Sequence, residues 1–193
     1  MSLRGLYISG DVVGSPGGAG AVTRNELKAL QDLPCKVRVL DGINNVIPAY
    51  AHLDLPFLWD YQALSSLEPE LRNLDYGVKD PPRPQLAHIY SGCYSETVRA
   101  LKRAGVRVTY TSPAHNRELS IEEAKICGLP PPWPHVTDEA LWKQHNQGLR
   151  EADMVVAPSS ASAEYLSSLG VKNLCVIPHG TEIPETVAPF QEE

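Results

Sequence analysis

The feature that most constrains the fold is a repeated alternation of short apolar segments with longer amphipathic ones. The apolar segments are rich in β-branched or aromatic residues and are bounded by Gly, Pro, Asp or Ser, which predicts β-strands. They are residues 6–9, 37–40, 86–90, 106–111, 154–157 and 174–177. None shows a clean alternation of polar and apolar residues, which is typical of strands covered on both faces. The chain is therefore expected to form a parallel sheet.

Helices are expected between these strands. Thr23 followed by Glu26, and Ser120 followed by Glu123, match the capping box that starts a helix. Thr137-Asp138 is predicted to start a longer helix. Its apolar stripe would consist of Leu141, His145, Gly148, Leu149 and Ala152.

Two further helices are predicted from their ends. Ser159 or Ser160 can cap a helix that Gly170 stops, and Gly105 can end the helix around residues 98–101. Strands and helices alternating at this spacing predict a doubly wound, Rossmann-like α/β fold with helices on both sides of the sheet. A length of 193 residues fits a single domain.

Composition excludes several classes of protein. Seventeen basic and twenty-three acidic residues leave a net charge of −6, which does not favour a nucleic-acid-binding protein. No run approaches the ~18 apolar residues of a membrane span, and the N-terminus lacks the regions of a signal peptide. The four cysteines (Cys35, Cys93, Cys127, Cys175) are widely spaced, so we expect small buried hydrophobes rather than disulfides. A cytoplasmic location is expected.

A glycine-rich loop follows the first predicted strand. Its sequence is Gly14-Ser15-Pro16-Gly17-Gly18-Ala19-Gly20. Glycine lets the backbone approach a ligand, and a following helix start offers N–H groups to a phosphate. The spacing matches neither the dinucleotide-binding fingerprint nor the P-loop, so an ordinary surface loop is the alternative interpretation.

Other candidate residues follow later strands. His115 and Asn116 come directly after strand 106–111, and ligands bind at the carboxyl edge of open parallel sheets. Ser159 follows the next strand, and His179 and Glu182 follow the last one. Local packing or a turn is the alternative role for each. No His spacing matches a helical zinc motif, so no metal site is predicted.

Four segments, in this order, resemble the N-terminal half of a GT-B-fold glycosyltransferase, most closely the retaining family 4 group. They are the glycine loop with its helix, Thr109–His115, residues 151–159 and residues 176–182. His179 and Glu182 stand where the family usually has Asn and Asp.

The resemblance implies that a sugar moves from a nucleoside-diphosphate donor to an acceptor hydroxyl with retention, without a metal or other cofactor. It implies that Gly17, Gly18 and Gly20 face the donor diphosphate and that His115 is catalytic. The residues implied to line the cleft are Ser15, Asn116, Ser159, His179 and Glu182.

The family's second, donor-binding domain has no counterpart in these 193 residues. The resemblance therefore implies that residues 1–183 form the acceptor-side domain of a hexosyltransferase, followed by a tail or linker at 184–193. Its partners would be the sugar donor, the acceptor and the missing domain, with no nucleic acid and no integral membrane segment. The domain alone is expected to be inactive. The alternatives are a non-catalytic phosphate-binding module and an adaptor.

Overall fold

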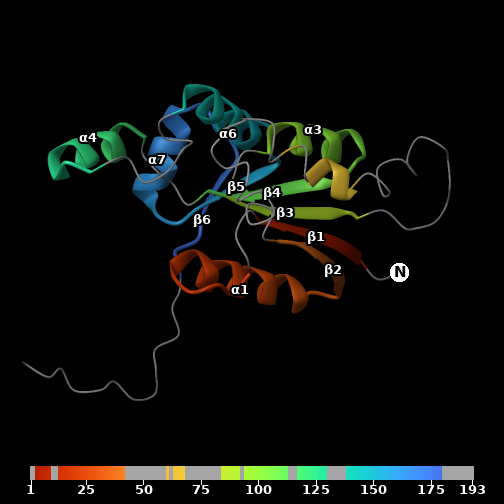
Figure 1. Cartoon of the computed structure of the whole chain (residues 1–193). Coiled ribbons are helices and arrows are strands. Elements are labelled where there is room, and N and C mark those ends of the chain that lie inside the picture. Colours follow the sequence, from red (N-terminus) through yellow and green to blue (C-terminus); the bar gives the residue numbers. More distant parts are fainter. Residues whose placement is uncertain are drawn as a thin grey trace, which may run out of the picture.

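The computed structural model describes residues 3–9, 13–41, 60, 63–67, 84–91, 94–112, 117–129 and 138–179 (Figure 1). Within these ranges, six strands form one sheet in the order β2-β1-β3-β4-β5-β6, and every neighbouring pair is parallel. The strands are β1 (Leu3–Ser9), β2 (Cys35–Leu40), β3 (Leu86–Tyr90), β4 (Arg107–Thr111), β5 (Met154–Ala157) and β6 (Leu174–Val176). All six predicted strands are confirmed.

Helices lie on both faces of the sheet, as the alternation predicted. They are α1 (Gly18–Gln31), α3 (Ser95–Arg103), α4 (Arg117–Cys127), α6 (Glu139–Glu151) and α7 (Ser160–Ser168). Figure 1 shows α1 on one face and α3, α6 and α7 on the other, with α4 projecting beyond the sheet. The chain therefore has a doubly wound, Rossmann-like α/β fold.

The two faces of the sheet differ in chemistry. The face under α3, α6 and α7 is apolar, and its fully buried strand residues are Ile8, Ala87, Ile89, Val108, Tyr110, Val155 and Ala157. On the α1 face, the hydrogen-bonding register places Tyr7, His88 and Thr109 side by side on neighbouring strands. Because burying apolar area is the main driving force of folding, the first face forms the core.

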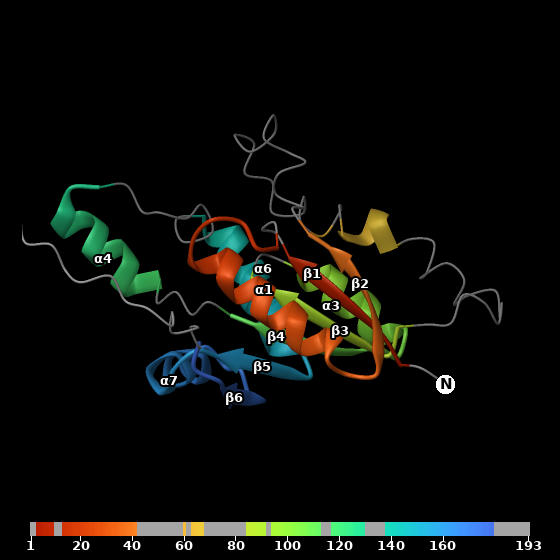
Figure 2. The same cartoon turned by 90° about the horizontal axis from the view of Figure 1, so that it is seen from below.

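The described helices cover the α1 face only in part. Figure 2, which looks at the sheet from the α1 side, shows β5 and β6 beyond the edge of this helix. Met154 of β5 is 45% exposed. The expectation of strands covered on both faces is therefore wrong for β5 within the described part of the chain.

Both capping boxes were wrong predictions. Helix α1 begins at Gly18, so Thr23 lies inside it, where its hydroxyl donates to the carbonyl of Gly20 and accepts from the backbone N–H of Gly14. Glu26 accepts a hydrogen bond from Tyr7 of β1 instead of closing a cap. Helix α4 likewise begins at Arg117, before Ser120. In α1, hydrogen bonds to Gly14 and Tyr7 thus take the place of the predicted capping box.

The other helix ends match the sequence. Asp138 caps α6 by accepting from the N–H groups of Ala140 and Leu141, and Ser159 caps α7 by accepting from the N–H of Ser162. The predicted stripe of α6 is buried throughout. Gly105 and Gly170 follow α3 and α7 with positive φ angles, as helix-ending glycines do.

The cysteine prediction is only partly right. Cys35 and Cys175 are half-buried, but Cys127 is exposed because it ends the projecting helix α4. Cys93 lies outside the described residues. No described helix combines the length and apolar character that crossing a membrane requires.

Candidate functional site

The candidate site lies at the carboxyl edge of β1 and β3, where the chain leaves two neighbouring strands toward opposite faces. After β1 it enters α1 on one face, and after β3 it enters α3 on the other. Ligands of open parallel sheets bind at such switch points, because the two connections diverge and leave a crevice. The N-termini of α1 and α3 both belong to this edge.

The N-terminus of α1 is open. Its N-cap is Gly17, which provides no side-chain hydrogen bond, and the first turn has no acidic residue. The first helical hydrogen bond runs from the N–H of Ala21 to the carbonyl of Gly17. The preceding N–H groups, starting with Gly18, thus have no partner within the helix and carry the positive end of its dipole. This arrangement favours an anion.

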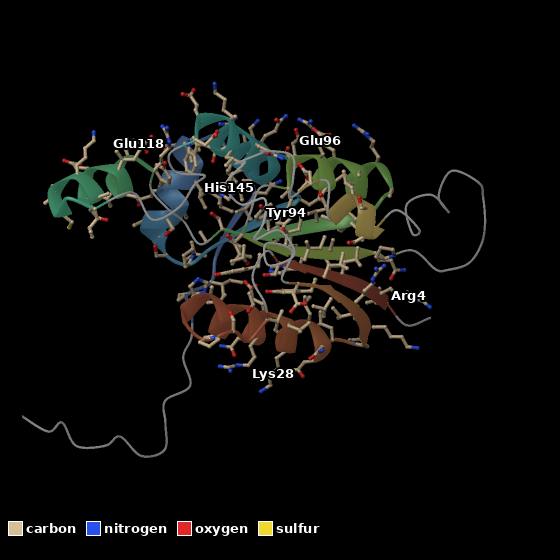
Figure 3. The ribbon with its side chains drawn as sticks, viewed as in Figure 1. Arg4, Lys28, Tyr94, Glu96, Glu118 and His145 are labelled. Atoms are coloured by element: carbon tan, nitrogen blue, oxygen red, sulfur yellow. The ribbon has the colours of Figure 1, made fainter. Side chains whose placement is uncertain are left out.

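The N-terminus of α3, in contrast, is already filled. The buried carboxylate of Asp60 accepts from the N–H of Glu96 at 2.9 Å and of Thr97 at 2.7 Å, and from Gln144 of α6 at 2.6 Å. Figure 3 shows Glu96 at this helix. Since side chains also cap α6 and α7, α1 is the uncapped one among the four helices whose N-caps are described.

The structure gives a different answer for each of the three predicted phosphate-binding glycines when we ask why the residue is a glycine. Gly17 has a φ of 107°, which side chains rarely allow. A Cβ on Gly20 would collide with the backbone of Ser15, so this glycine permits the tight approach of the loop. A Cβ on Gly18 would meet nothing within 4 Å, and its φ is not positive. Backbone conformation therefore explains Gly17 and packing explains Gly20, but neither explains Gly18.

Of the other predicted site residues, the structure describes Ser15, Ser159 and His179. Ser15 contacts Gly20 through its backbone, and the Ser159 hydroxyl is used in capping α7. His179 is exposed and lines a pocket described below. His115, Asn116 and Glu182 lie outside the described residues, so their roles stay predictions.

The described residues on either side of positions 113–116, Ser112 and Arg117, are both hydrogen-bonded to other elements. On one side, the N–H of Ser112 donates to the carbonyl of Val156 at 3.1 Å. On the other, the N–H of Arg117 donates to the hydroxyl of Tyr165, which itself donates to Glu118 at 2.8 Å. Figure 3 shows Glu118 at the end of α4 nearest α7. The contacts of Tyr165 thus fix where α4 begins.

The tyrosine also has a shifted pKa. Burial is the main cause that raises the pKa of Tyr165, to about 12, and the hydrogen bond to the Glu118 carboxylate raises it further. The N–H of Arg117 acts in the opposite direction. Tyr165 therefore stays a neutral donor at any physiological pH.

A second feature, which sequence reasoning missed, is a pocket of about 410 Å³ between α1 and the sheet. Its floor is a hydrogen-bonded cluster centred on His88. The ring Nδ1 lies 2.7 Å from the Thr109 hydroxyl and Nε2 lies 3.2 Å from the carboxylate of Glu26, which also accepts from Tyr7 at 2.9 Å. The sequence feature that could have indicated this cluster is a histidine inside the otherwise apolar run 86–90.

Comparison with known proteins gives two findings. A model of the family described as Glycosyltransferase Family 4 matches residues 16–183. The solved structure of UGT73P12 from Glycyrrhiza uralensis, complexed with glycyrrhetinic acid 3-O-monoglucuronide, is similar at 12% identity and a TM-score of 0.43, over 90% of this chain and 48% of that one. The chain thus spans about half the length of this structure. None of the curated proteins matches.

Proposed function

Because the chain belongs to glycosyltransferase family 4, we propose that it is the acceptor-side domain of a two-domain hexosyltransferase. The whole enzyme would transfer a sugar from a nucleoside-diphosphate donor to an acceptor hydroxyl with retention. Residues 1–183 would form this domain, and the donor would lie between it and a second domain. The observation that carries the proposal is the open N-terminus of α1 at the switch point of the sheet.

The proposed chemistry uses this N-terminus as an electrostatic partner of the donor. When the bond between the sugar and the diphosphate breaks, negative charge grows on the leaving diphosphate. Fixed N–H donors stabilise such charge without reorganising. The dipole of α1 would contribute ~0.3–1 kcal/mol if the site is exposed and up to ~2 kcal/mol if it is partly buried. No cofactor is needed for this step.

The remaining predicted residues act around this centre in the proposal. His115 would bind the donor sugar at the reacting carbon, and Asn116, His179 and Glu182 would line the cleft. Gly18 has a distinct role, because its missing side chain leaves the first turn of α1 accessible to the diphosphate.

The anion site can be tested on the 193-residue chain with pyrophosphate as the probe. We expect saturable shifts of the backbone amide signals of residues 17–20 in an NMR titration. Gly18→Ala adds a methyl group where the ligand approaches, so it should weaken binding at least threefold. Ser160→Ala changes the first residue of the capped helix α7 and is the matched control. Unchanged binding by the Gly18→Ala variant would refute the site.

The second test concerns activity. We expect no sugar transfer by the 193-residue chain when it is incubated with nucleotide sugars and alcohol acceptors, because half of the proposed site is missing. Turnover by this chain would contradict the two-domain assignment.

A further inference from the structure

The pocket under α1 combines an apolar wall with a polar floor. Val22, Ala29 and Leu30 of α1 line it and recur with Glu26 at the spacing of one helix face, and Leu33 adds to this side just after the helix ends. Val156 and the residues that follow β6, including Ile177, form the opposite side. A volume of about 410 Å³ lies within the range of small-molecule sites.

The floor is hydrogen-bonded within itself. The His88 ring Nε2 lies 3.2 Å from Glu26 and 3.3 Å from the Thr111 hydroxyl, and Nδ1 lies 2.7 Å from the Thr109 hydroxyl, so both ring nitrogens have partners within the floor. The Tyr7 hydroxyl and His88 contact the same carboxylate oxygen, Oε2. Among the described residues, none is hydrogen-bonded to Oε1.

The charge of the lining is one-sided. Among the described residues that line the pocket, Glu26 is the one acidic side chain, and none is a Lys or an Arg. Lys28 of the same helix points away from the sheet (Figure 3). A carboxylate that is four-fifths buried beside apolar walls attracts a cation more strongly than it would in bulk water.

We propose that this pocket binds a small organic cation, with its ammonium group at Glu26 and its apolar body between α1 and β5. Oε1 supplies the acceptor, and the aliphatic side chains of α1 and Val156 enclose the body. An anion of the same shape is disfavoured, because the described lining places a carboxylate there and offers no Lys or Arg to pair with it.

This site is distinct from the anion site at the first turn of α1, although His179, which is proposed to line the cleft of the enzyme, also lines the pocket. None of the residues 14–20 lines the pocket. The two sites share α1 but use different parts of it, and they have opposite charge preferences. Failure of one proposal leaves the other intact, because pyrophosphate tests the first turn of α1 and an organic cation tests the face from Val22 to Leu33.

Three probes with the same ring test the proposal. They are benzylammonium, benzyl alcohol and benzoate, titrated into the isotope-labelled 193-residue chain and followed by NMR. We expect benzylammonium to shift the amide signals of residues 22–33 and 154–157 saturably. Its affinity should exceed that of each other probe at least fivefold. A smaller preference, or shifts confined to other residues, would overturn the proposal.

Two variants locate the site. Glu26→Gln keeps the shape and an acceptor for Tyr7 but removes the charge, so benzylammonium should bind at least fivefold more weakly. Ala29→Phe fills the pocket from an exposed helix position, and it should weaken binding of all three probes even if the Glu26 variant fails to fold. Glu164→Gln, an exposed change on α7, is the control. Wild-type binding by Ala29→Phe would refute the location.

Discussion

Asp60 and Thr97, 37 residues apart in sequence, form a doubly hydrogen-bonded pair inside the protein. One oxygen of the Asp60 carboxylate accepts from both the backbone N–H and the hydroxyl of Thr97, each at 2.7 Å. Asp60 is 2% exposed, and its bond from Gln144 extends the contact to α6. A distant side chain therefore does what a local N-cap residue normally does for a helix. It joins the chain before β3 to α3 and α6.

Removing this cap should destabilise the protein strongly. In Asp60→Ala the donors of Glu96, Thr97 and Gln144 lose their acceptor in a buried place, which costs about 1–3 kcal/mol for each group left unsatisfied. We expect a loss of at least 3 kcal/mol in the free energy of unfolding, measured with urea. Asp138→Ala, which removes a local cap, should cost only about 1 kcal/mol. Equal losses in the two variants would contradict the inference that Asp60 stabilises the fold more than a local cap does.

The glycines of the loop should separate stability from ligand binding. Gly20→Ala forces a methyl group onto the backbone of Ser15, so we expect a loss of about 1–3 kcal/mol in thermal or urea unfolding. Gly18→Ala has open space around it and should leave stability unchanged or raise it by up to ~1 kcal/mol. If Gly18→Ala proved the more destabilising, packing rather than ligand access would explain both glycines.

The raised pKa of Tyr165 predicts a change in stability at high pH. Because the folded-state pKa of about 12 exceeds the ordinary value of 10, the contribution of Tyr165 is complete below pH 10 and disappears as the pH rises toward 12. Tyr165→Phe lacks this contribution at every pH. The free-energy difference between wild type and variant should thus shrink between pH 10 and pH 12, as measured by urea unfolding. A constant difference would argue against the shift.

The lowered pKa of Asp153 predicts a loss of stability at low pH rather than at high pH. Burial alone would raise the pKa of its carboxyl, but hydrogen bonds from the N–H of Val108 and from Lys102 outweigh burial and lower it. A lowered pKa stabilises the fold above the ordinary value near 4, and the benefit disappears as the pH falls through the folded-state pKa. The side chain is 39% exposed, so the ion pair should contribute less than about 1 kcal/mol. Asp153→Asn should be less stable than wild type at pH 7, and the difference should shrink as the pH falls below the ordinary value near 4.

In an enzyme that carries both domains, His115→Ala should lower kcat by at least tenfold and leave the KM for the acceptor nearly unchanged. The reason is its proposed contact with the donor sugar at the reacting centre rather than with the acceptor. Steady-state kinetics with both substrates varied will test this. An unchanged kcat would remove His115 from the reaction.

What the sequence determined by itself is the order and type of the elements. The apolar runs and the caps at Asp138 and Ser159 depend on neighbours within a few residues, so they can be identified locally. The glycine loop was also visible, and so was the family resemblance, which the family model confirms.

The tertiary structure decided which of these sequence patterns form the local structure that they predict. Thr23 and Glu26 form a capping box in sequence, but Gly14, Tyr7 and His88 satisfy them in the fold, so the helix starts at Gly18 instead. Asp60 and the pocket under α1 depend on residues that are distant along the chain. Hydrogen bonds and pockets of this kind form only when strands and helices pack, and no periodicity in the sequence records them.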